Sequence, residues 1–169
     1  PRTVGHVAGV LCVTWTLVIA AAGGTLYRSE ARSARQAAAV AARSQFVKDV
    51  IYRRWNARLG GVYAQVAAGV EPNPHLTQVD NRDISTPSGE ELTLINPAYM
   101  TRQVHELGLE TEGIVGHITS LDPIRPENAP EPWEAAALRS FEEGVEEVTN
   151  VTGANGKRVL RLMRPLVPD

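Results

Sequence analysis

The histidines and the cysteine of this sequence are the side chains best suited to bind a metal ion. His6, His75, His105 and His117 are widely scattered, and no two of them stand at metal-ligand spacing. Cys12 is the only cysteine, so the chain has no internal disulfide and no Cys-x-x-Cys-His motif for covalent haem attachment. We therefore expect no metal site built from this chain alone.

The sequence carries no recognisable catalytic motif. It has no Gly-rich phosphate loop, no His-Glu-x-x-His, no Gly-x-Ser-x-Gly and no kinase signature. Its net charge of -2 also leaves no broad positive field to attract a phosphate backbone. The sequence predicts a protein that is not an enzyme and has no nucleic-acid partner.

Two histidines are candidates for ligand contact. His117 lies in an apolar segment, where burial would hold the imidazole neutral and leave one ring nitrogen able to accept a hydrogen bond or to ligate. A satisfied core histidine is the commoner outcome for such a residue. His105, beside Arg102 and Glu106 on a predicted helix, reads as a solvated or capping residue.

Four further side chains are candidates for a cofactor or ligand pocket. Tyr99 and Met100 read as core residues, although a thioether that faces a cavity could contact a haem edge. The Arg102 guanidinium could bind a carboxylate through two hydrogen bonds, or form an ion pair with Glu106 on its own helix. Trp55 is expected either to pack against a sheet or to form a cavity wall.

A long apolar stretch must hold these residues near a membrane. Residues 7–27 carry no charge, and about 20 apolar residues cross a bilayer as a helix, so residues 1–28 are predicted to be a transmembrane anchor. The alternative is a secretory signal peptide cleaved near Ala20, Ala21 and Ala22. Both readings place the rest of the chain beside or beyond a membrane.

A second long helix is predicted over residues 29–69, because this stretch lacks proline and Gly69 could cap it. Its apolar residues recur every three or four positions and form one helix face: Val47, Ile51, Trp55, Leu59, Val62 and Val66. A helix that continues from a membrane span can carry a shift or rotation across the bilayer, and the alternative is a helix that merely packs on a sheet. Gly60 and Gly61 could bend it. Long membrane-proximal helices often pair, so a homodimer is expected.

Residues 70–169 are predicted to form a small α+β module. The patterns indicate strands at 92–95 and 113–119, helices at 97–107 and 133–143, a proline-rich loop between them, and a hairpin of residues 145–152 and 157–163 around Gly153-Ala154-Asn155-Gly156. The predicted fold is α+β: an N-terminal transmembrane helix that continues into a long helix, then a small antiparallel sheet with helical insertions, as in PAS-like or Cache-like modules. Both ends of the chain look cut, so the sheet is expected to be incomplete at its C-terminal end.

Several ordered blocks between residues 46 and 166 carry a family resemblance. They are 54–56 with 60–63, 72–74, 92–103, 116–121, 126–130, 133–134, 137–138, 141–142 and 160–166. Together they resemble the PAS-like, c-type-haem-associated sensor domains, long catalogued as a domain of unknown function, of bacterial membrane histidine kinases and cyclic-dinucleotide signalling proteins.

The resemblance implies an extracytoplasmic sensory input domain that uses haem for redox or gas sensing. It implies an inner-membrane protein with a periplasmic sensor module and a cytoplasmic output domain. Haem c is the implied cofactor of the full-length protein, although this chain lacks the attachment motif that haem-bearing members carry shortly after the segment matching 162–166. The implied pocket residues are His117, Met100, Tyr99, Arg102 and Trp55.

Two other functions remain open from the sequence. One is a membrane-anchored monohaem electron carrier, in which the domain transfers electrons without signalling. The other is a haem-free domain that binds a small carboxylate, for which Arg102 would be the recognition residue.

Overall fold

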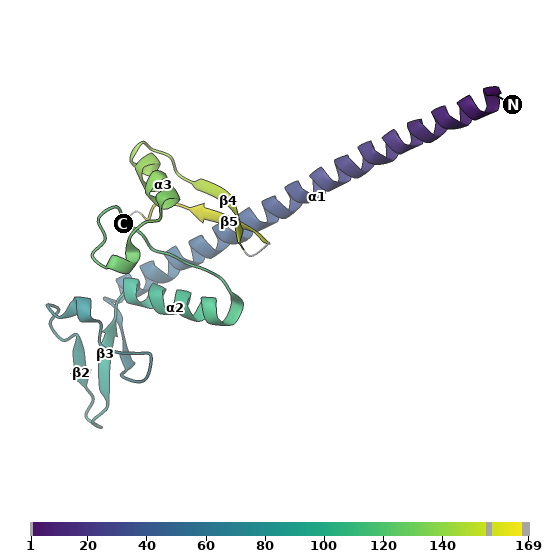
Figure 1. The fold of residues 1–169 in the computed structure, drawn as a ribbon. Helices are drawn as coiled ribbons and strands as arrows, with labels where there is room; N and C mark the ends of the chain where they lie inside the picture. Colours follow the sequence, from purple (N-terminus) through teal and green to yellow (C-terminus); the bar gives the residue numbers. More distant parts are fainter. Residues whose placement is uncertain (1, 155–156, 167–169) are drawn as a thin grey trace. The chain divides into compact units, whose positions relative to one another are not determined.

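The chain begins with one long helix and continues into small sheets and helices (Figure 1). The computed structural model describes residues 2–154 and 157–166. Helix α1 runs without a break from Arg2 to Arg58. Its N-terminal part is long and apolar enough to cross a membrane, with a mean hydropathy of 2.0 over its most apolar window and no burial, and a signal sequence would give the same pattern.

Helix α1 ends earlier than its sequence predicts. Gly60 and Gly61 adopt φ angles of 74° and 99°, which glycine adopts without steric cost. Their N–H groups donate to the carbonyls of Ala57 and Asn56 at 3.0 and 2.9 Å, as at a glycine-capped helix C-terminus. The prediction of helix through residues 59–69, with Gly69 as its cap, is therefore wrong.

The residues after this cap form a three-stranded antiparallel sheet. Strands β1 (Val62–Gln65) and β2 (Asp83–Ser85) flank β3 (Glu91–Ile95), the strand predicted at 92–95. Val62 pairs with Ile95, and Asp83 pairs with Thr93. The fully buried Thr93 hydroxyl donates to Asp83 Oδ1 at 2.6 Å, so this cross-strand pair fixes the register. The short 3-10 helix η1 (Pro74–Leu76) lies between β1 and β2 in sequence.

Helix α2 (Pro97–Glu112) follows β3 directly and is longer than the predicted 97–107. Asn96 caps it by accepting the N–H of Tyr99 at 2.9 Å, and Pro97 occupies its first turn. Gly113, with a φ of 66°, ends it. The strand predicted at 113–119 is wrong: this segment has no regular structure, and the N–H groups of Gly113 and Ile114 donate to carbonyls in the last turns of α2, whereas a strand would pair with a neighbouring strand.

The last elements are helix α3 (Pro132–Glu142) and the hairpin of β4 (Val148–Ala154) and β5 (Lys157–Met163). A short 3-10 helix, η2 (Pro126–Asn128), precedes α3. Both the helix and the hairpin confirm the sequence patterns, although the hairpin forms a two-stranded sheet of its own. The predicted turn lies partly outside the described residues. The α+β fold class, with a long apolar helix before small antiparallel sheets, is confirmed.

The chain divides into two compact units. One contains α1 up to Arg43 together with residues 150–161, and the other contains residues 44–149 together with the segment that begins at Leu162. The second unit holds every candidate site residue. Its buried apolar side chains are few: Leu94, Ile95, Tyr99 and Ala137.

Within the second unit, α1 presents the opposite face to the one its apolar pattern predicts. Val47, Ile51, Trp55 and Leu59 are each between 45% and 57% exposed, so the alternative in which this face packs on the sheet is wrong for these residues. The covered face carries polar residues instead, among them the fully buried Asn56. We name the exposed residues Val47, Ile51, Trp55 and Leu59 the apolar stripe of α1.

Candidate functional site

The covered face of α1 carries three polar side chains at a regular spacing. Asp49, Arg53 and Asn56 stand four and three residues apart, so they project from one side of the helix. Asp49 and Arg53 form hydrogen bonds to side chains of α2, and Asn56 donates to the carbonyl of Ile95, two residues before α2 begins. This face is therefore a line of polar contacts.

The partners of these side chains run in the reverse order along α2. Asp49 Oδ2 lies 3.0 Å from His105 Nε2, and Arg53 Nη1 donates to Thr101 Oγ1 at 3.2 Å. Asn56 Nδ2 lies 3.7 Å from Met100 Sδ. Because the order reverses, α2 packs antiparallel to the end of α1. We name these contacts the polar ladder: Asp49–His105, Arg53–Thr101 and Asn56–Met100.

Burial affects the polar groups of the ladder, both the charge of Arg53 and the hydrogen bonding of Asn56. Desolvation lowers the pKa of Arg53, and the nearby Asp49 carboxylate opposes that shift. Asn56 donates to the Ile95 carbonyl at 3.0 Å, but its Oδ1 has no protein partner. A buried polar atom without a partner costs free energy. The contact between the two helices is therefore specified by hydrogen bonds and is not simply hydrophobic packing.

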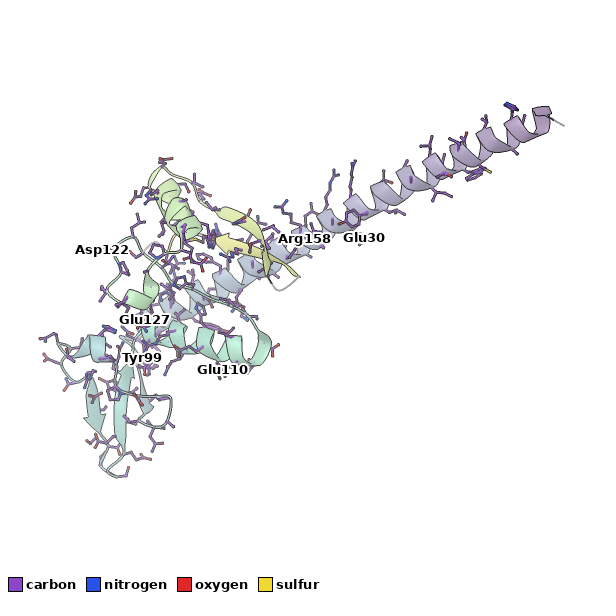
Figure 2. The ribbon with its side chains drawn as sticks, viewed as in Figure 1. Glu30, Tyr99, Glu110, Asp122, Glu127 and Arg158 are labelled. Carbon is purple, nitrogen blue, oxygen red and sulfur yellow. The ribbon has the colours of Figure 1, made fainter. Side chains whose placement is uncertain are left out.

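The first turns of α2 also hold the loop that follows β1. The Tyr99 hydroxyl donates to the Glu71 carbonyl at 2.6 Å, and Gln103 Nε2 donates to the Gly69 carbonyl at 3.0 Å. Tyr99 is only 6% exposed and lies at the N-terminal end of α2 (Figure 2). This buried tyrosine thus joins the helix to the loop.

Arg102 lies beside Tyr99 on α2. Its guanidinium carbon is 4.4 Å from the centre of the Tyr99 ring, a cation-π geometry. Its Nε lies 3.8 Å from Glu106 Oε1, and the Glu106 side chain is 64% exposed. The ion pair to Glu106 foreseen as the alternative exists, but it is long and open to water.

The other candidate pocket residues are not all brought together. Tyr99, Met100 and Arg102 share the first turns of α2, and Met100 reaches Asn56. Trp55 belongs to the apolar stripe and is 54% exposed, so the expectation that it packs against the sheet is wrong.

His117 lies in the segment without regular structure after α2. Its Nδ1 lies 2.9 Å from Glu134 Oε1 on α3, and its Nε2 lies 3.2 Å from the Glu127 carbonyl oxygen. Burial lowers its pKa, but these two acceptors outweigh burial and the pKa is raised above the usual value. Burial acts on the pKa in the expected direction, but the surrounding hydrogen-bond partners and acidic groups together shift the pKa of His117 the opposite way.

Sequence reasoning missed Asp49 and Arg53, and it read His105 as a solvated or capping residue. His105 is half-buried against Asp49, and a Cβ at Gly116 would overlap its ring. The spacing of Asp49, Arg53 and Asn56 was the available signal. It was outweighed by the stronger apolar periodicity on the other side of the helix.

These features define a small α+β module attached to a long apolar helix. A protein-family model, Tll0287-like, matches residues 26–169, which is most of the chain. The chain therefore belongs to the Tll0287-like family. No curated protein and no solved structure gives a significant match to it.

Proposed function

We propose that this chain is the extracytoplasmic sensory input domain of a bacterial membrane signalling protein, with its apolar helix as the anchor and a missing cytoplasmic output domain. The observation that carries the proposal is the polar ladder. It connects α2, where the candidate ligand residues stand, to the same helix that continues into the apolar segment. A ligand that moves α2 would therefore act on α1.

Haem was the cofactor implied by the resemblance, and two described side chains that could ligate its iron, His117 and Met100, are already engaged within this chain. Both ring nitrogens of His117 face hydrogen-bond partners, and Met100 Sδ faces an Asn56 N–H group. These contacts favour a haem-free version of the sensor.

The ligand class that fits best is a small carboxylate. Arg102 is held by a ring face and by one long ion pair to an exposed glutamate. A carboxylate ligand could replace Glu106 with two short hydrogen bonds to the planar guanidinium. Arg102 also stands next to Thr101, a member of the polar ladder, so binding there would reach α1.

The first test is thermal stabilisation of the whole chain in detergent micelles by acetate, succinate and citrate. At least one should raise the unfolding temperature of wild type. Arg102→Ala should abolish that rise, whereas the exposed control Arg139→Ala should keep it. Glu106→Ala should strengthen it, because a competing carboxylate is removed.

The outcomes separate sensing from simple binding. A sensor should show ligand-dependent amide hydrogen exchange in residues 44–58 of α1 as well as in α2. Exchange changes confined to α2 would indicate a binding module without transmission. No stabilisation by any of the three acids, or a Soret absorption band in the purified chain, would overturn the carboxylate version.

A two-fold dimer is part of the same proposal. The apolar stripe repeats every four residues, the spacing at which the surface ridges of two helices interlock. A second copy of α1 offers the same stripe. Light scattering in detergent should give a dimer for wild type and a monomer for Ile51→Glu, and an unchanged mass for the variant would refute this contact.

A further inference from the structure

The surroundings of His117 form a second polar cluster, apart from the polar ladder. It joins the segment after α2 to the start of α3 and to η2, where Glu127 lies (Figure 2). Glu134 is only 6% exposed, and both of its carboxylate oxygens are engaged. Oε1 faces His117 Nδ1, and Oε2 accepts the Glu131 N–H at 2.7 Å in the capping box of α3.

The hydrogen-bond geometry of this cluster determines how many protons the cluster must hold. A carbonyl oxygen can only accept a hydrogen bond, so the contact with Glu127 requires a proton on His117 Nε2. The contact with Glu134 then requires a second proton, either on Nδ1 or on the carboxyl group. A neutral imidazole beside an ionised Glu134 would leave a ring lone pair facing either the buried carboxylate or the Glu127 carbonyl oxygen, depending on the tautomer. The cluster is complete only with that extra proton.

The segment between His117 and Glu134 forms a loop whose two halves are joined by hydrogen bonds. Thr119 Oγ1 donates to the Asn128 carbonyl at 2.8 Å, and the Ser120 N–H donates to the same carbonyl at 3.3 Å. Four prolines, Pro123, Pro126, Pro130 and Pro132, stiffen the segment. We name residues 118–131 the proline loop. His117 lies just before this loop and contacts the Glu127 carbonyl within it and the Glu134 carboxylate just after it, so His117 ties the loop closed.

We propose that the His117–Glu134 pair is a proton-dependent clasp that keeps the proline loop closed while it holds the extra proton and releases the loop when that proton is lost. The charged groups facing His117 are acidic: Glu134 and Glu131 on α3, while the Glu127 side chain on η2 is paired with Arg125 at 3.5 Å. Loss of the extra proton therefore sets a ring lone pair against the Glu134 carboxylate or against the Glu127 carbonyl oxygen, and one of the two contacts is lost. The clasp acts whether or not the module binds a carboxylate at Arg102.

The sign of the pH dependence follows from the pKa of His117. Because the folded-state pKa is raised, the clasp contributes fully below the unfolded value of about 6.5 and is lost as the pH rises through the folded value. Each pKa unit of the shift corresponds to about a tenfold change in the closed-to-open ratio.

The test combines two measurements on the whole chain in detergent micelles. Carbon NMR of labelled histidine should show His117 titrating above the ordinary value of about 6.5. Hydrogen exchange, corrected for its intrinsic pH dependence, should show stronger protection of the proline loop at a pH below the titration of His117 than at a pH above it. His75→Gln, at an exposed histidine, should behave like wild type.

Two variants separate the clasp from a general loss of structure. His117→Gln should give low loop protection at both pH values while helix content stays the same. Glu134→Gln retains a capping-box acceptor but removes the charge, so it should lower the pKa of His117 and flatten the pH dependence. A wild-type loop equally protected at both pH values, or a His117 that titrates at or below the ordinary value, would overturn the proposal.

Discussion

At the scale of single residues, burial in this protein follows hydrogen-bonding partners more than side-chain polarity. Asn56 and Trp55 are neighbours on α1, yet the asparagine is fully buried and the tryptophan is more than half exposed. Asn56 has the Ile95 carbonyl and Met100 Sδ as partners across the helix interface. A polar residue can be buried where such partners exist, as they do for Asn56.

This neighbouring pair gives a direct stability prediction. Asn56→Ala removes the hydrogen bond to the buried Ile95 carbonyl and should reduce the free energy of unfolding by about 1–3 kcal/mol. Both variants are made in the Ile51→Glu background, where the proposed contact between two apolar stripes is absent, and there Trp55→Ala should change it by about 0.5 kcal/mol or less because the side chain is exposed. Urea unfolding followed by circular dichroism measures both. Equal losses for the two variants would contradict the burial described for α1.

At the scale of elements, the contact between α1 and α2 depends on polar pairs from distant parts of the chain. Asp49 and His105 are 56 residues apart in sequence. Neither side chain signals its partner locally, and no spacing rule joins them. Buried polar pairs between helices tolerate few alternative alignments, which gives the polar ladder a role in setting how α2 sits on α1.

A double-mutant cycle tests whether the two members of one ladder pair, Asp49 and His105, interact. Asp49→Asn and His105→Gln should each destabilise the chain, and the double variant should lose less than the sum of the two. Contacting residues typically show coupling free energies of about 0.5–3 kcal/mol. Pairing Asp49→Asn with the exposed His75→Gln provides the control cycle, which should be additive. Additivity in the Asp49–His105 cycle would show that the contact does not connect the helices.

At the scale of the whole molecule, the long apolar helix raises the choice between an anchor and a signal sequence. Helix α1 is continuous from Arg2 to Arg58, so the apolar stretch and the polar ladder belong to one element. A retained anchor gives any movement of α2 a path toward the membrane. A cleaved signal would leave only the part of α1 that carries the ladder.

Mass spectrometry of the chain expressed in a bacterium decides between these two. Under the proposed function the membrane-bound protein keeps Cys12 and Trp15, and deleting residues 1–28 moves it to the soluble fraction. An alkaline wash, which strips peripheral proteins, should leave the undeleted chain in the membrane. A mature protein that begins just after residues 20–22 would show a signal peptide instead.

The sequence by itself determined the features that depend on local chemistry. Asn96-Pro97 predicts the start of α2 because the cap and the missing N–H act within one turn. Tyr99, Met100 and Arg102 stand together because they share the first turns of one helix. The apolar N-terminal helix, α3 and the C-terminal hairpin were also predicted from nearby residues alone.

Only the tertiary structure decided which side of α1 is covered and where His117 finds its partners. Apolar periodicity shows that a helix has one apolar face, but it does not show that the opposite face meets matching polar groups 44 to 56 residues away. The same reason explains the missing strand at 113–119, whose β-branched residues favour extension. A strand needs a partner, and here the partners of the segment are a glutamate on α3 and carbonyl groups of the proline loop.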